Sequence, residues 1–491
     1  MGSSKWISPF MRQCYVTLGV SLNIAGQGLV VGYTAVLLPQ LRAAGSDVPV
    51  DEDSGSWIAS IVSFAIIAAN FFASTVLTMF LGRKSINLLS LVPMVAGWIC
   101  IYLATSVTWL LIARLLQGFS IGCSASLGPT LIGEYTSPNN RGAFLTTISI
   151  GTALGNLFAH TMGMYLSWRI TGLVIAVIGL VNLLIVLTSP ESPSWLINQG
   201  RYDDGRKIFR LLRGDGEEEE LEAMIAANLE LRQSKSDEKK TLSENLRANL
   251  QYFKETIVKK EFYKPIFIMA HVYAISQWAG ATIMSAYTLD VFNAIITPPF
   301  DPALLIITAD VHRITLNTIS VFIIKKVKRR TIITTTLSIV LLDFVVIAAY
   351  TYAKACNVLP YDHPWIGIFL VHVLTFTIAT GTVPIVFIVA GELFPLEYRS
   401  ISGGISVFFY SLNFFAATKT APYLFSNIGI YGAMCVYAVV VFYCLSIIWK
   451  YLPETKDRTL QDIEDEFRGV KRIKKQKSLG VISMAEFSKK V

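Results

Sequence analysis

Carboxylates and guanidinium groups that recur as pairs are the residues of this sequence with the most evident chemistry. Glu134 and Arg141 in the first half reappear as Glu392 and Arg399 in the second half, at one displacement along the chain. Partly buried ion pairs can hold one conformation of a protein and become hydrated when that conformation changes. The pattern predicts ion pairs that form and break as two parts of the molecule move.

Two further charged positions recur at nearly the same displacement, namely Arg83 as Arg329 and Glu191 as Glu454. A displacement that stays nearly constant over half of the chain indicates two duplicated units, which is typical of membrane transporters. The alternative is that these charges only anchor helix ends to lipid headgroups. The candidate gating residues are therefore Arg83, Glu134, Arg141, Glu191, Arg329, Glu392, Arg399 and Glu454.

The elements that must position these charges are long and apolar. Of the 491 residues, 53% are hydrophobic and 15% are charged, whereas soluble domains carry about 25% charged residues. A membrane-spanning helix needs about 20 mostly apolar residues, and about twelve such stretches occur here. They are 14–38, 57–80, 86–105, 108–130, 143–166, 169–188, 265–292, 303–324, 331–353, 365–390, 401–424 and 430–451. The predicted fold is an all-α membrane protein of twelve transmembrane helices in two six-helix halves.

Several function classes are excluded by this composition. The six cysteines are scattered and show neither a disulfide framework nor the spacing of a metal site. The net charge of +8 comes from basic residues that lie between apolar runs and in the tail, so we expect no nucleic-acid partner. We expect neither an enzyme nor a metal or other cofactor. The expected partners are the lipid bilayer and a small solute, and the expected state is a monomer.

The distribution of Lys and Arg predicts the orientation, because cytoplasmic loops are enriched in both. Only Arg42, Arg169 and Lys354 fall in loops on the other side when the N-terminus is placed inside. Both termini are therefore predicted to be cytoplasmic, and the polar start of the chain does not read as a signal peptide. The expected parts are an N-terminal half (1–188), a helical cytoplasmic loop (189–264), a C-terminal half (265–452) and a cytoplasmic tail (453–491).

A set of short motifs, taken together and in this order, resembles the sugar porters of the major facilitator superfamily over nearly the whole chain. The resemblance is greatest to the insect facilitated trehalose transporter group. It implies transport by alternating access, in which a solute site between the halves opens to each side in turn, and we expect the plasma membrane as its location. The motifs are Ser56-Trp57-Ile58-Ala59-Ser60, Gly82-Arg83-Lys84, Ala113-Arg114-Leu115-Leu116-Gln117-Gly118, Pro190-Glu191-Ser192-Pro193-Ser194-Trp195-Leu196 and Pro453-Glu454-Thr455-Lys456.

The resemblance also implies where the solute binds. Sugar porters carry a Gln-Gln-x-Ser-Gly-x-Asn pattern, and the matching stretch here runs from Ser276 to Thr282 with one glutamine kept as Gln277. Three other positions of this family's sugar site match Ser149, Phe387 and Asn413. Amides and hydroxyls of this kind suit a sugar, because they donate to and accept from its hydroxyl groups.

The departures from that pattern are alike: each replaces a long amide side chain with a short hydroxyl side chain. Ser276 stands where the family has a glutamine, Thr282 where it has an asparagine, and Ser149 where hexose carriers have a glutamine. Shorter side chains enlarge the site and remove bidentate hydrogen bonds. A disaccharide could fit, and so could a solute that is not a sugar.

Arg313 is an unusual residue for its position, because it lies about halfway along the apolar stretch 303–324. A charge at that depth costs about 2.5–3.5 kcal/mol on insertion scales unless it meets a partner or a cavity. Asp310, one turn earlier, and Asp290 are the candidate partners. The alternative is that Arg313 binds an anionic solute.

Proton-coupled sugar porters carry a carboxylate in their first helix, but the stretch 14–38 contains no acidic residue. The resemblance therefore implies facilitated diffusion, and the predicted function is uniport of a sugar, either trehalose or a hexose. Two alternatives remain open. One is a carrier of a non-sugar organic solute that uses Arg313. The other is a solute sensor that does not transport, suggested by the basic tail from Lys471 to Lys477 and by the loss of family acids near Arg83 and Arg329.

Overall fold

The computed structural model describes residues 8–72, 81–236, 254–359, 361–394, 399–456, 458 and 460–469. Every regular element among these residues is a helix. Nine of the described helices are long and apolar enough to cross a membrane. This agrees with the all-α membrane fold that the hydropathy pattern predicts.

The first set of helices follows the expected apolar stretches closely. It consists of α1 (Pro9–Arg42), α2 (Glu52–Phe72), α4 (Arg83–Leu103), α5 (Val107–Tyr135), α6 (Pro138–Tyr165) and α7 (Trp168–Thr188). The expected stretch 57–80 continues beyond Phe72 into residues that lie outside the described part. In the described part of the chain between this set and the next lie three shorter helices, α8 (Pro193–Asn198), α9 (Tyr202–Arg213) and α10 (Glu218–Ser236).

The second set of helices is more often interrupted. It consists of α12 (Lys260–Trp278), α13 (Ala281–Ala286), α14 (Thr288–Ile295), α15 (Pro302–Lys326), α16 (Arg329–Ala355), α17 (Pro364–Thr377), α18 (Pro384–Leu393) and α19 (Arg399–Tyr451), followed by the short α20 (Leu460–Arg468). Helix α19 is broken at Gly429, whose φ of 69° is not helical. Its two limbs correspond to the expected stretches 401–424 and 430–451.

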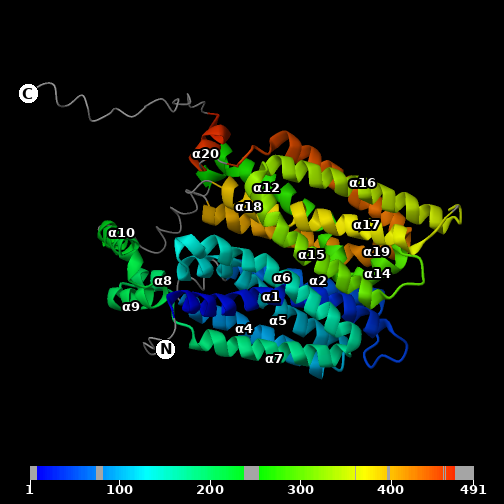
Figure 1. The fold of residues 1–491 in the computed structure, drawn as a ribbon, viewed down its shortest axis with the longest axis horizontal. Coiled ribbons are helices and arrows are strands. Elements are labelled where there is room, and N and C mark those ends of the chain that lie inside the picture. The colour runs from blue at the N-terminus through cyan, green and yellow to red at the C-terminus, as the bar shows by residue number, and fades with distance from the viewer. Residues whose placement is uncertain are drawn as a thin grey trace, which may run out of the picture.

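The two sets form two layers that lie side by side (Figure 1). Helices α8 to α10 and α20 all lie at one end of the layers, which we call the loop end; we call the opposite end the far end. Across the boundary between the layers, which we call the seam, α6 packs on α15 and α2 packs on α19. Helix α1 also reaches α13.

Two helices of the second set are interrupted partway along their length. Gly280 has a φ of 100° and separates α12 from α13, a conformation that glycine adopts without steric cost. A π-helical turn from Ile378 to Thr382 separates α17 from α18, and such turns are frequent at functional sites. Interrupted helices at membrane depth expose backbone and side-chain polar groups to a site between the halves.

The contact between α1 and α6 depends on glycine. A Cβ added to Gly28 of α1 would lie 1.9 Å from the Thr152 carbonyl oxygen of α6, and one added to Gly155 would lie 2.4 Å from the Ala25 carbonyl oxygen. Small residues allow helices in membranes to approach this closely. This contact fixes α6, which carries side chains of the seam.

We predict that Gly28→Ala lowers the stability of the protein by about 1–3 kcal/mol, because the added carbon forces the two helices apart. The measurement is the unfolding temperature of the purified protein in detergent, followed by intrinsic fluorescence. Gly403→Ala is the matched control, since a Cβ at Gly403 meets nothing within 4 Å. Equal unfolding temperatures for the two variants would show that the close contact is not required.

Candidate functional site

Polar side chains cluster at the interruption between α12 and α13. The Gln277 amide nitrogen donates to Ser276 Oγ at 3.0 Å, and Thr282 Oγ1 donates to Gln277 Oε1 at 2.6 Å. All three side chains are buried. The break at Gly280 brings these groups together, because it allows Thr282 to turn back toward Gln277. The structure thus places three of the predicted substrate-binding residues in one hydrogen-bonded group.

Asn413 of α19 joins this group from a neighbouring helix. Its Oδ1 accepts from Trp278 Nε1 at 3.1 Å, and its own amide nitrogen donates to the Phe409 carbonyl at 2.9 Å. One turn before it, the Tyr410 hydroxyl is a hydrogen-bond partner of both Gln277 and Gln27. Because Gln27 lies on α1, this tyrosine connects the two layers across the seam.

The sequence reasoning missed Tyr410, Gln27 and also Tyr273, whose ring meets that of Tyr410 edge-on at 5.4 Å between centroids. A signal was available for Tyr410, since it lies one helical turn from the selected Asn413. Ser149 lies on α6, half-buried. Phe387 lies on α18 and Arg399 begins α19, but the side chains of these two lie outside the part that the structure describes.

The predicted ion pair between Arg313 and Asp310 is present, with 2.9 Å between Nη2 and Oδ1. Arg313 also donates to Ser285 Oγ at 3.1 Å. The other candidate partner, Asp290, was a wrong choice for Arg313, because it pairs with Arg42 of α1 at 3.5 Å. On α15, Asp310 is only one turn from Arg313, whereas Asp290 lies on α14, where Arg42 is within reach.

His160 of α6 completes a second connection across the seam. Its Nδ1 lies 2.6 Å from Asp310 Oδ2, and its Nε2 lies 3.3 Å from the Ser285 carbonyl oxygen. Asn156, one turn earlier on α6, donates to Ser285 Oγ at 3.2 Å. We call His160, Asn156, Ser285, Asp310 and Arg313 the seam cluster. No prediction from the sequence connected His160 with Asp310.

The far end of the seam is held by a different set of contacts. Lys419 of α19 lies 3.0 Å from Asp53 of α2 and 4.2 Å from the centre of the Trp57 ring. The Tyr423 hydroxyl donates to the same Asp53 carboxylate at 2.6 Å, and Ser426 donates to Glu52 at 2.7 Å. Together with the pair between Arg42 and Asp290 on α1 and α14, these bonds close the far end between the layers.

The repeated charges of the loop end pair within each layer. Arg83 lies 3.5 Å from Glu134 in the first layer, and Arg329 lies 3.0 Å from Glu392 in the second. Glu191 accepts from the backbone N–H of Lys84 at 2.9 Å. Glu454 accepts from that of Arg329, also at 2.9 Å. These two carboxylates cap the starts of α4 and α16, where the helix dipole favours negative charge.

The short helices of the loop end dock on the first layer. Arg213 of α9 donates to the Glu134 carbonyl oxygen at 3.2 Å. Arg141 lies 3.9 Å from Glu220 of α10. Helices α9 and α10 are joined by an ion pair between Arg210 and Glu218, and the Arg210 guanidinium holds the pKa of the Glu218 carboxyl below its usual range.

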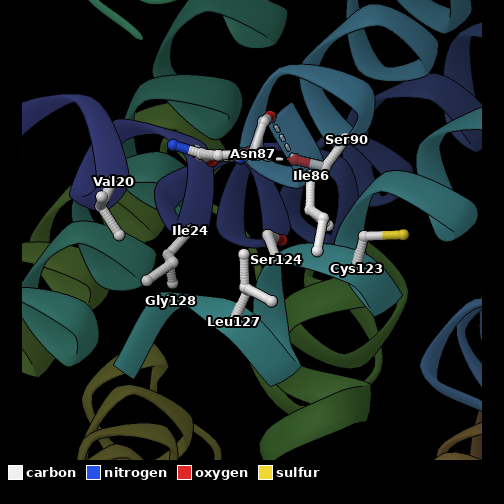
Figure 2. A pocket seen from close by; sticks show the side chains of 10 residues that line it. Val20, Ile24, Ile86, Asn87, Ser90, Cys123, Ser124, Leu127 and Gly128 are labelled. Atoms are coloured by element: carbon white, nitrogen blue, oxygen red, sulfur yellow. Dashed lines mark hydrogen bonds between the residues drawn. The ribbon is translucent and has the colours of Figure 1, made fainter. Parts of the chain in front are cut away.

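A small hollow lies inside the first layer, between α1, α4 and α5 (Figure 2). Its polar wall is formed by Asn23, whose amide nitrogen donates to Asn87 Oδ1 and Ser90 Oγ at 2.7 Å each. Because its walls all belong to one layer, relative movement of the layers does not open it to each side in turn. Among the described residues, no group of His, Cys, Asp and Glu is placed to hold a metal ion.

Comparison with known proteins assigns the family. The family described as "Sugar (and other) transporter" matches residues 25–467. The chain belongs to the sugar transporter family. With its membrane-spanning helices, this member of the family is a multi-pass membrane protein.

Relatives of this sugar transporter family member include the facilitated trehalose transporter Tret1 of Drosophila yakuba, 26% identical over 97% of this chain and 54% of that protein. Tret1 of Apis mellifera ligustica is 26% identical over 94% of this chain and 89% of that protein. The chain thus spans about half the length of the fruit-fly relative.

Solved structures share the fold. The inward-open xylose transporter XylE from E. coli superposes with a TM-score of 0.68 at 18% identity, over 92% of this chain and 99% of that chain. XylE bound to 6-bromo-6-deoxy-D-glucose gives a TM-score of 0.70 at 16% identity, over 93% and 99% of the two chains. These likenesses confirm the major facilitator fold that the motif resemblance implies.

We predict that Lys419→Met opens the far end, because it leaves Asp53 without its cation and removes the cation over Trp57. The measurement is the rate at which a membrane-impermeant maleimide labels Ser56→Cys, a fully buried position whose hydroxyl donates to the Lys419 carbonyl. The background carries serine at the exposed Cys356 and Cys435. Labelling should become several-fold faster.

Lys450→Met serves as the control, since Lys450 lies in the last turn of α19, at the loop end. Unchanged labelling in Lys419→Met, or an equal increase in Lys450→Met, would contradict a closing role for Lys419.

Proposed function

We propose that this protein carries a neutral sugar, trehalose or a hexose, across the plasma membrane by facilitated diffusion with alternating access. The observation that supports this most directly is the group of amides and hydroxyls around Gln277. It lies at a broken helix next to the seam between two layers, where carriers of this architecture bind their substrates. The names of the insect relatives suggest trehalose.

The orientation in this proposal follows the Lys and Arg distribution, so the loop end faces the cytosol and the far end faces outward. Residues 1–188 and 265–452 then form the two moving halves, with 189–264 and 453–491 on the cytosolic side. The far-end bonds from Asp53 to Lys419 and from Arg42 to Asp290 keep the outer side closed. These bonds must break before the outer side can open. We propose that the protein acts as a monomer.

The repeated charges Arg83, Glu134, Arg329 and Glu392 take part in the gate by keeping each half rigid. Each pair joins helices of one half, so the halves turn as units rather than bending. Glu191 and Glu454 support the same unit by capping helix starts. Arg141 and Arg399 are proposed to contribute to the same inner gate.

The sugar binds to the side chains of Gln277, Ser276, Thr282 and Asn413. Ser149 of α6 and Phe387 of α18 line the path of the sugar between the two halves. The aromatic rings of Trp278 and Tyr410 supply apolar faces for the C–H surface of the sugar. Every group in this set is uncharged. Arg313 has its charge balanced by Asp310 at 2.9 Å, which favours a neutral solute over an anion.

We predict that Gln277→Ala and Asn413→Ala each reduce the uptake of labelled trehalose or glucose about tenfold. Each substitution removes one or two hydrogen bonds to the sugar, at about 0.5–1.5 kcal/mol per bond. The measurement uses proteoliposomes without a pH gradient. Ser446→Ala is the matched control. Ser446 is exposed, and its hydroxyl donates to the Phe442 carbonyl oxygen of its own helix. Normal uptake in both amide variants would contradict the assigned site.

We predict that Arg313→Gln leaves the order of competing solutes unchanged, with neutral sugars ahead of organic anions. The measurement is a competition panel against a labelled sugar. Breaking a buried pair destabilises a protein by about 3–5 kcal/mol, so the double variant Arg313→Gln with Asp310→Asn is the control for lost stability. Inhibition by anions that disappears in both variants would instead support the carrier of an anionic solute.

A further inference from the structure

The turn between α15 and α16 carries an excess of positive charge at the loop end. Lys326 ends α15, Lys328 directly precedes α16, and Arg330 lies in the first turn of α16. A chain spans at most about 3.6 Å per residue, so the Cα atoms of these three residues lie within about 14 Å of one another. Both lysines are exposed, and Arg330 is half-buried. We call these three residues the basic turn.

No described carboxylate forms an ion pair with the basic turn. The carboxylate beside it, that of Glu454, accepts from the backbone N–H groups of Arg329 and Arg330 at 2.9 and 3.2 Å. Glu392 pairs with Arg329 instead, at 3.0 Å. Like charges held this close repel one another, so the basic turn favours an anion from outside the chain.

The first half contains an equivalent turn without the two lysines. The repeat places Gly82 where Lys328 stands. It places Phe80 where Lys326 stands. Gly82 precedes α4 as Lys328 precedes α16, with an extended backbone and no side-chain cap in either place. Because the fold builds this start of a helix without a lysine, folding alone does not account for the two lysines.

A structural bond is made by Arg330 and not by the lysines. The Arg330 guanidinium donates to the Trp449 carbonyl oxygen at the end of α19. Lys84, its counterpart in the first half, donates to the carbonyl oxygen of Leu187 at the end of α7 at 2.7 Å. One cation thus ties the turn to the neighbouring helix in each half. The two lysine side chains of the basic turn make no bond to any described residue, so their charges are available to an external anion.

The surroundings of the basic turn are those of a membrane interface. Helices α16 and α19 pack together, and both expose large apolar side chains, such as Leu342 and Phe442. Trp449 is exposed where α19 ends beside the turn. Tryptophan is enriched where the hydrocarbon meets the headgroups, which places the basic turn at the level of the headgroups.

We propose that the basic turn binds the headgroup of an anionic phospholipid, whose acyl chains lie along α16 and α19. Lysine binds phosphate as a point charge, and each cation near an anionic membrane surface adds to the attraction. A soluble phosphate compound shares the headgroup chemistry, but the apolar faces and Trp449 favour a lipid. The inference rests on the orientation in the proposed function, because anionic lipids are concentrated in the cytoplasmic leaflet. It does not depend on which solute is carried.

The test measures lipid binding to the purified full chain in a neutral detergent, without sugar. Phosphatidylinositol 4-phosphate and phosphatidylcholine with identical acyl chains are compared by native mass spectrometry. We expect the wild type to bind the anionic lipid at least about tenfold more tightly. The double variant Lys326→Gln with Lys328→Gln should bind it about thirtyfold more weakly, at about fivefold for each cation removed. Its binding of phosphatidylcholine should not change.

Arg201→Gln with Lys207→Gln is the matched control, because it removes two charges from exposed positions at α9, also at the loop end. This control should keep the preference for the anionic lipid. Equal binding of the two lipids by the wild type overturns the proposal, as does undiminished binding in the double variant of the basic turn or an equal loss in the control. Equal competition by inositol 1,4-bisphosphate, which carries the phosphates without acyl chains, overturns a lipid as the occupant.

Two further measurements keep the outcomes distinct. If the double variant is not recovered as folded protein, Lys328→Gly decides the question, since the first half has Gly82 at this place, and its expected loss of affinity is about fivefold. Sugar uptake is measured separately in proteoliposomes. An absent lipid preference with normal uptake refutes this site alone, and a normal lipid preference without uptake refutes the carrier alone.

Discussion

Within the apolar part of a bilayer, a polar side chain has no water to bind and must find its partner in the protein. In this chain many of those partners lie across the seam between the two layers. Gln27 meets Tyr410 there, and His160 meets Asp310. The association of the two layers therefore depends on polar contacts that a change of conformation can exchange, rather than on apolar packing alone.

The two ends of the molecule use charge for different purposes. At the loop end, Arg83 with Glu134 and Arg329 with Glu392 join helices of the same layer. At the far end, Asp53 with Lys419 joins helices of different layers. The rocking movement of the proposed function needs both kinds of bond, since the first keeps each half rigid while the second breaks and forms again. Tight contacts such as that of Gly28 with Thr152 add to the rigidity of the first half.

The fold was largely predictable from the sequence, because it follows from local properties. Apolar length locates the helices, and the repeat of Glu134 and Arg141 as Glu392 and Arg399 indicates two related halves. The interrupted helix at Gly280 was not predicted as an interruption, although its neighbours Gln277 and Thr282 were selected. The π-helical turn at Ile378–Thr382 has no local signal of comparable strength.

The connections across the seam could not be predicted, because they depend on how helices far apart in sequence meet. Asp310 was paired with Arg313 correctly, since one helical turn separates them. Its second partner, His160, lies on α6, and no spacing rule connects the two. No spacing rule connects Lys419 with Asp53 either. Asp290 was predicted as a possible partner of Arg313, but in the structure it pairs with Arg42.

The hydrogen bonds inside the candidate site have a consequence for the facilitated transport that we propose. Gln277 Oε1 accepts from Thr282, and its amide nitrogen donates to Ser276, so in the proposed function the sugar replaces existing bonds rather than filling vacant ones. Exchanging one hydrogen bond for another yields little net free energy, which keeps affinity low. Low affinity is an advantage for a carrier driven only by a gradient, because the solute must leave on the other side. The change from long amides to short hydroxyls acts in the same direction, since it favours a roomier site with fewer bidentate contacts.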